Sequence, residues 1–112
     1  MYMMAGAFRY CASLTEFTLP EGFTAVSDSL LQHCEALVRV NLPRDIAYIG
    51  RYAFYECTAL TEITLPEGLI EIADNAFEKC TALNGLVIPA TVKTIGWRAL
   101  YGPKNTVYLN KK

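Results

Sequence analysis

A unit of 23 residues recurs along the chain, and this period limits the fold more than any other feature. Its clearest copy is AFYECTALTEITLPEGLIEIADN, residues 53–75. Three residue types return at the same interval: Cys11, Cys34, Cys57 and Cys80; Leu14, Leu37, Leu60 and Leu83; Pro20, Pro43, Pro66 and Pro89. A fixed period carried by apolar positions is typical of a solenoid, because one unit buries its apolar face only by stacking on its neighbours.

Apolar and polar residues alternate just before each proline. Phe17 and Leu19 flank Thr18 in the first unit, and the pattern returns in the following units. This period of two predicts one strand per coil, at about 15–19, 38–42, 61–65 and 84–88. Strands at the same point of every coil are expected to be parallel and in register. The proline, which has no N–H donor, is expected to end each ladder.

The remainder of each unit predicts a second extended segment and a short turn. The pair Phe23 and Val26 recurs three times downstream, and we interpret it as an irregular extended segment. Ala53 and Phe54 also have counterparts in the other units, and we expect them to enter a short helical turn that directs Cys57 inward. The predicted fold class is an α/β solenoid with short parallel strands on one face and irregular or short helical turns on the other.

The repeat pattern predicts a single solenoid domain over residues 1–112. We expect a partial coil at 1–6, full coils over about 7–98 and a shortened terminal coil at 99–112. In the terminal coil, Val107 and Leu109 restore the alternation if the loop has lost two residues, and TVYLN would then form the last strand, with Tyr108 facing out. Neither end has a polar capping unit. We therefore expect a segment of a longer array or an end covered by a partner, with the strand at 106–109 as a candidate edge for homodimer formation.

Three outward columns carry charges that alternate in sign from coil to coil. These columns are Glu16, Arg39 and Glu62; Glu21, Arg44 and Glu67; and Asp28, Arg51 and Asp74. Because parallel strands stack about 4.8 Å apart, we expect each arginine to lie between two carboxylates of its neighbours. We interpret the columns as solvated ladders that favour one register. Charges that bind a ligand are the alternative.

The four cysteines lie one period apart, and no CxxC pair is present. We interpret them as reduced thiols buried in the core; disulfide bonds and metal ligation are the alternatives. His33 is the only histidine, in a column with Tyr10, Glu56 and Lys79. We interpret it as a solvated turn residue, with a functional base as the alternative. No catalytic residue is expected, because no serine or cysteine nucleophile has a histidine in a matching column. No metal ligand or cofactor site is expected either.

Net charge, apolar run lengths and the first residues exclude several classes of protein and partner. The formal net charge of −1 gives no electrostatic footprint for nucleic acid or an anionic membrane. No apolar run approaches the roughly 20 residues of a membrane-spanning helix. The start, MYMMAGAFRY, has no basic region followed by a long apolar run. A signal peptide is therefore not expected here, which leaves a cytoplasmic protein or a mature or excised segment as alternatives.

The phrase AFYECTALTEITLPEGLIEIADNAFEKCTAL resembles the BspA-like class of leucine-rich repeats in its Ala-Phe, Cys, Leu, Ile-x-Leu-Pro and Ile-Gly positions, from residue 3 to about 109. Leu30–Leu31 departs from Ala-Phe, and Ser27 and Ala73 depart from the glycine kept at Gly50 and Gly96. The resemblance implies a curved right-handed solenoid with a parallel sheet on one face. It also implies surface or secreted proteins of bacteria and some protists, which act in adhesion and protein binding and have no catalytic residues.

Two sets of outward residues are candidates for binding. The first is aromatic, because tyrosine and tryptophan are favoured in interfaces, and local packing is its alternative: Tyr48, Tyr52, Tyr55, Trp97 and Tyr101. The second lies on the strand face: Glu16, Arg39, Asn41 and Glu62. The leading hypothesis is a non-catalytic protein-binding or adhesion module of an extracellular or cell-surface protein, with an unidentified protein partner. A structural spacer without a ligand and a targeting domain attached to an enzyme are the alternatives.

Overall fold

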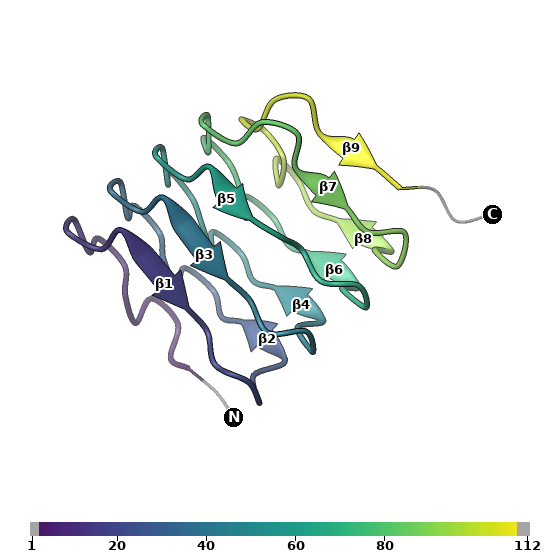
Figure 1. The fold of residues 1–112 in the computed structure, drawn as a ribbon, viewed down its shortest axis with the longest axis horizontal. Coiled ribbons are helices and arrows are strands. Elements are labelled where there is room, and N and C mark those ends of the chain that lie inside the picture. The colour runs from purple at the N-terminus through teal and green to yellow at the C-terminus, as the bar shows by residue number, and fades with distance from the viewer. Residues whose placement is uncertain (1–2, 110–112) are drawn as a thin grey trace.

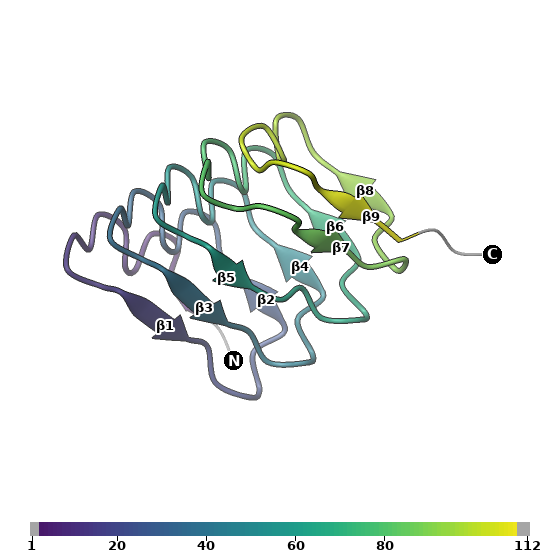
Figure 2. The ribbon, with the colours of Figure 1, turned by 45° about the horizontal axis from the view of Figure 1, so that its top comes forward.

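The computed structural model describes residues 3–109, and within them the chain forms a parallel β-solenoid. One row of strands runs along one side of the coils: β1 (Glu16–Thr18), β3 (Arg39–Asn41), β5 (Glu62–Ile63), β7 (Val87–Ile88) and β9 (Val107–Tyr108). A second row runs along the other side: β2 (Ala25–Val26), β4 (Tyr48–Ile49), β6 (Glu71–Ile72) and β8 (Thr94–Ile95). Figure 1 shows the two rows advancing together, and Figure 2 shows that they form separate layers.

The strand pairing confirms the 23-residue register over most of the solenoid. Phe17 pairs with Val40 and Val40 pairs with Ile63, all in parallel. The second extended segment, expected to be irregular, is a parallel sheet of its own, in the order β2-β4-β6-β8, with the same step of 23. Each coil therefore contributes a strand to both sides, and the apolar side chains between the two rows form the core.

The core is a stack of equivalent side chains from successive coils. Phe54 and Phe77 are fully buried, and their rings stack with centroids 5.1 Å apart. Leu30 and Leu31, which replace the Ala-Phe pair, are buried as deeply as Ala53 and Phe54. The second coil thus fills the same space with two side chains of medium size instead of one small and one large.

The segments expected to be irregular or short helical turns are turns without helix, and the pattern of hydrogen bonds explains why. The N–H groups of Leu31 and His33 donate across to the next coil, to Ala53 O and Tyr55 O, at 2.9 and 2.7 Å. The N–H groups of Leu30, Gln32 and Cys34, which alternate with them, bond to carbonyl groups three residues back within their own turn. Half of the donors that an α-helix would use are therefore committed to the neighbouring coil. Within residues 3–109 there is no helix, and so none long and apolar enough to cross a membrane.

The strand row on the β1 side is interrupted at Gly85. This residue occupies the column of Glu62 but has a φ of +78°, a left-handed conformation that ends the extended chain. The expected strand at 84–88 is therefore reduced to β7, which pairs with β9 and not with β5. The sheet β1-β3-β5 therefore ends before the predicted strand at 84–88.

The last coil is shorter than predicted. Val87 pairs with Val107 and Ile88 pairs with Tyr108, so the step is 20 residues and three have been lost, not two. Tyr108 consequently shares the column of the buried Ile88, and Val107 takes the outward column that was assigned to Tyr108. Leu109 is half exposed at this end. The expected contributions of residues 1–2 and 110–112 to the end coils lie outside the described residues.

The cysteine column forms a ladder of hydrogen bonds between successive coils. Three Sγ atoms each donate to a backbone oxygen of the preceding coil: Cys34 to Phe8 O at 3.1 Å, Cys57 to Leu31 O at 3.1 Å and Cys80 to Phe54 O at 3.0 Å. All four cysteines are free, and Cys11 at the first coil is half-buried. Burial raises the pKa of Cys57 to about 12, and it raises the pKa values of Cys34 and Cys80 as well.

These raised pKa values predict a loss of stability in alkali. Between the ordinary thiol pKa of 9.0 and about 12, the unfolded chain releases the Cys57 proton while the folded chain retains it. The free energy of unfolding should therefore fall as the pH rises through this window, by up to about 1.4 kcal/mol per pH unit for each such thiol. Urea unfolding at pH 8 to 11 should show a shallower fall for Cys57→Ala. Leu60→Ala, which empties a neighbouring core position, should keep the wild-type slope, and equal slopes for all three proteins would contradict this account.

The charged columns form one ion pair, where three alternating ladders were expected. Arg39 contacts Glu62 Oε1 through Nε at 2.8 Å and through Nη2 at 2.7 Å. Glu16 instead accepts a hydrogen bond from Asn41 Nδ2 at 3.0 Å. Within residues 3–109, no ion pair includes Arg44 or Arg51. The expectation that every arginine lies between two carboxylates is therefore wrong, because most of these long side chains remain in solvent.

The two arginines of the second coil should respond differently to charge reversal. Arg39→Glu replaces an ion pair with like charges and should cost about 1 kcal/mol or less at low salt, since both partners are half exposed. The loss should shrink in about 1 M salt, where screening is strong. Arg44→Glu is the matched control and should leave the free energy of unfolding unchanged. A loss for Arg39→Glu that is independent of salt would contradict the role of this pair.

Candidate functional site

The turns between the second row of strands and the cysteines carry a continuous band of aromatic and charged side chains. We call this band the turn strip. It consists of Tyr10, His33, Tyr52, Tyr55, Glu56, Glu78, Lys79, Trp97, Arg98 and Tyr101. Its residues occupy equivalent turn positions in successive coils, one period apart or adjacent to such a position. The strip therefore runs along the solenoid axis, across the coils.

Several residues of the turn strip have left-handed backbone conformations. His33, Tyr52 and Glu56 have φ values of 61°, 58° and 57°, and Lys79 and Arg98 have values of 65° and 56°. This region is sparsely populated for residues other than glycine and costs of order 1–3 kcal/mol per residue. It is maintained here by the hydrogen bonds between coils. Left-handed residues therefore recur at equivalent positions of successive turns.

The first half of the strip is a chain of ring contacts. Tyr10 stacks on His33 with centroids 4.6 Å apart and an angle of 6° between the rings. Tyr55 meets both His33 and Tyr52 edge to face, at 5.3 and 5.2 Å. Lys79 Nζ lies 5.7 Å from the centre of the Tyr55 ring and 3.6 Å from Glu56 Oε2. Tyr55, followed by Glu56, raises the pKa of the Lys79 ammonium, because both groups favour its charged form.

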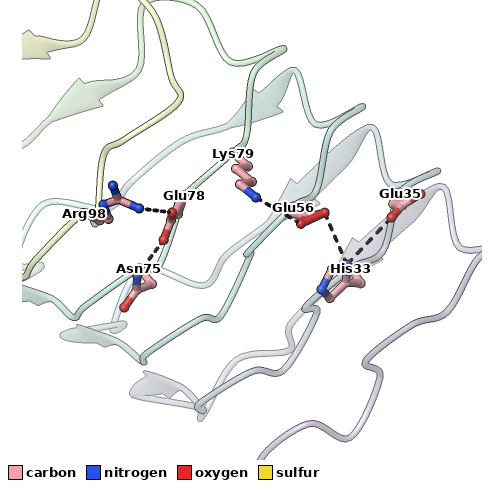
Figure 3. Close-up of polar contacts among 7 residues, drawn as sticks. All are labelled: His33, Glu35, Glu56, Asn75, Glu78, Lys79 and Arg98. Atoms are coloured by element: carbon pink, nitrogen blue, oxygen red, sulfur yellow. Dashed lines mark hydrogen bonds and ion pairs between the residues drawn. The ribbon is translucent and has the colours of Figure 1, made fainter.

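The second half of the strip is organised by Arg98. Its guanidinium lies over the rings of Trp97 and Tyr101, at 4.8 and 4.6 Å from their centres. Its Nη1 lies 3.3 Å from Oε2 of Glu78, which is only 4% exposed. Asn75 Nδ2 donates to the other oxygen of Glu78 at 2.5 Å (Figure 3). A buried carboxylate with two partners fixes the guanidinium and with it the two exposed rings.

The structure separates the aromatic residues that were proposed as one group. Tyr52 and Tyr55 are in contact, and Trp97 and Tyr101 share Arg98. Tyr48 lies in β4, where its neighbours in the sheet are Ala25 and Glu71. No ring contact within residues 3–109 joins Tyr48 to the strip.

Residues that the sequence interpretation left out of the aromatic group complete the strip. Tyr10, His33 and Arg98 make the contacts that join its parts. Tyr10 and His33 lie one period apart, so the repeat itself contained the signal that they stack.

The strand-face candidates lie beside a shallow hollow. Arg39, Asn41 and Glu62 line a hollow of about 890 Å³ along β3, β5 and β7, where the strand row is interrupted. Asn41 bridges to Glu16 and also donates to Thr18 Oγ1 at 3.0 Å. The polar groups of this face therefore bond mostly to one another, which leaves fewer of them to contact a ligand.

Comparisons with known proteins identify the repeat. A family model described as the BspA type leucine rich repeat region, of six copies, matches residues 2–107. A leucine-rich repeat protein from T. pallidum is 31% identical, with a TM-score of 0.65 over 83% of this chain. One from Bacteroides ovatus is 24% identical, with a TM-score of 0.71 over 87% of this chain, a likeness of fold. This chain spans 56% and 30% of those two chains, respectively. Comparison with curated proteins finds no match.

Proposed function

Because the chain belongs to the BspA-type leucine-rich repeat family, we propose that it is a non-catalytic protein-binding module that acts in adhesion at a bacterial cell surface or after secretion. The turn strip is the surface through which it would bind. The repeat scaffold holds its turns in a fixed array, and the side chains on these turns would contact the partner. A scaffold of this kind offers a long, rigid surface without a closed pocket.

The observation that carries the proposal is the exposure of large aromatic rings held in fixed positions. Tyr10, Trp97 and Tyr101 are 62%, 68% and 61% exposed, although each contacts a neighbouring ring or guanidinium. Tyrosine, tryptophan and arginine are the residue types that dominate the energetics of protein interfaces. Because the contacts within the strip already restrict these side chains, less conformational entropy is lost when a partner binds.

The strand face is the second candidate surface, and it supports binding less well. Its exposed side chains are short or already paired, as Arg39 is with Glu62. Exposed ion pairs contribute little to affinity unless they are desolvated. We therefore assign the strand face a supporting role and use it as the control surface.

Selection from a displayed library of folded domains and peptides tests this proposal. Ligands retained by the immobilised chain should bind the triple variant Tyr10→Ala, Trp97→Ala, Tyr101→Ala about 30-fold more weakly or worse, as expected when interface hot spots are removed. These three side chains are largely exposed, so the variant should remain folded.

The matched control alters the strand face by Arg39→Ala, Asn41→Ala and Glu62→Ala, and it should bind the selected ligands as the wild type does. Ligands that bind both triple variants equally well would contradict the proposal. Failure to select any ligand would instead favour the structural spacer.

A further inference from the structure

Two side chains of the turn strip, His33 and Glu56, converge with the neighbouring Glu35 without forming hydrogen bonds to one another. His33 Nδ1 lies 3.7 Å from Glu35 Oε2 and 3.6 Å from Glu56 Oε1, and the three atoms all lie within 4.8 Å of one another. Figure 3 shows both carboxylates directed at the imidazole from two successive coils. These separations are longer than a hydrogen bond. The arrangement brings one nitrogen and two oxygen donors around a common point.

The two separations from His33 Nδ1, 3.7 and 3.6 Å, are close to those between donors around a bound metal ion. Zinc binds histidine nitrogen at about 2.0–2.1 Å and carboxylate oxygen at about 2.0–2.2 Å, so tetrahedral donors lie roughly 3.4 Å apart. Imidazole and carboxylate are donors that divalent transition metals accept. We propose that His33, Glu35 and Glu56 form a binding site for a divalent transition metal ion such as zinc. Three protein donors leave a fourth position for water or for a group from a partner.

The imidazole is held in place before any ion binds. Tyr10 stacks on one face of the His33 ring, and the edge contact with Tyr55 restricts it further. The backbone N–H of His33 donates to Tyr55 O at 2.7 Å, which fixes the turn from which the ring projects. The His33 side chain is 18% exposed, whereas that of Glu35 is 62% exposed. Because Glu35 is exposed and His33 is held by its ring contacts, a change of the Glu35 side-chain conformation can close the remaining distance around the ion.

Lys79 opposes metal binding. Its Nζ lies 3.6 Å from Glu56 Oε2, the second oxygen of the carboxylate that faces His33. Its positive charge both competes for Glu56 and repels a divalent cation. Removing this charge should therefore strengthen metal binding. A purely structural role for the His33 cluster does not predict this effect.

The test follows the imidazole resonances of His33 by NMR while zinc sulfate is added to the chain without added histidines. The assignment is unambiguous because His33 is the only histidine. The His33 signals should shift and saturate, and Zn²⁺ should raise the thermal unfolding midpoint. Calorimetry should show that His33→Asn, which tolerates the left-handed backbone, abolishes binding. Glu35→Gln and Glu56→Gln should each weaken it about tenfold or more, and Lys79→Gln should strengthen it several-fold. Glu62→Gln on the strand face is the matched control and should bind as the wild type does.

Two results would overturn the site. One is His33 signals that do not change up to millimolar Zn²⁺. The other is a zinc affinity that His33→Asn leaves intact but Cys11→Ala removes, which would place the ion at the half-buried thiol. Zinc binding needs no protein partner, so the metal site and the protein-binding surface can fail independently of each other.

Discussion

Phe54→Ala is expected to lower the free energy of unfolding by about 3–5 kcal/mol, the range for deleting a fully buried aromatic side chain. Phe54 has no exposed surface, and its ring stacks on that of Phe77 in the next coil. The backbone around it is fixed by hydrogen bonds to both neighbouring coils, so the space left by the ring cannot close easily. Urea unfolding followed by circular dichroism measures the loss.

The same column supplies the controls for this prediction. Phe54→Leu introduces the residue that stands at Leu31 one coil earlier and should cost less than Phe54→Ala, because it removes less of the buried side chain. Phe8→Ala alters the equivalent side chain at the first coil, where it is only half-buried, and should cost less than Phe54→Ala. Equal losses for Phe8→Ala and Phe54→Ala would show that stacking between coils is not the source of stability.

Gly50→Ala is expected to be nearly as damaging, at about 3 kcal/mol. A methyl carbon at this position would lie 2.7 Å from the backbone nitrogen of Asp28 and 2.8 Å from the carbonyl oxygen of Val26. Both are backbone atoms of the preceding coil, and Gly50 N–H donates to that same oxygen at 2.8 Å. The coils would have to separate to admit the methyl group, and overpacking against backbone costs about 1–3 kcal/mol or more.

Two further variants test the reason for this loss. Ala73→Gly, in the same column, should cost at most about 1 kcal/mol, since it removes a methyl group and loosens the backbone. Combining Gly50→Ala with Asp28→Ala should not restore stability, because the backbone atoms remain in place. Recovery in the double variant would show that the Asp28 side chain alone excludes the methyl group.

The sequence shows that glycine alternates with other residues in one column, which contains Ser27, Gly50, Ala73 and Gly96. It does not show the cause of this alternation. Asp28 Oδ1 accepts a hydrogen bond from the Arg51 backbone at 2.9 Å, directly after Gly50. Asp74 makes the same bond to Trp97 at 2.8 Å, after Gly96. A carboxylate in one coil and a glycine in the next thus belong to one contact. Spacing predicts a ladder of ion pairs in this charged column, because spacing alone does not distinguish a side-chain partner from a backbone partner.

The repeat period predicted the parallel strands and the core residues, because both depend on contacts that recur every 23 residues. It did not decide between irregular and short helical turns, since the deciding hydrogen bonds run between coils. It also missed the interruption at Gly85, where one residue changes the backbone conformation. Tyr10 and His33 share a column, so their stacking could be predicted from the period. The contacts of Arg98 with Trp97 and Tyr101 depend on local side-chain conformations that the period does not encode.

The most direct test of the central claim is the footprint of a selected ligand on the chain, measured from the changes in its backbone amide resonances. We expect the largest changes in the turns at 6–10, 29–33, 52–56, 75–79 and 97–102, continuous across several coils. The amides of β1, β3 and β5 should change little. A footprint centred on those strands, with the turns unaffected, would contradict the assignment of binding to the turn strip.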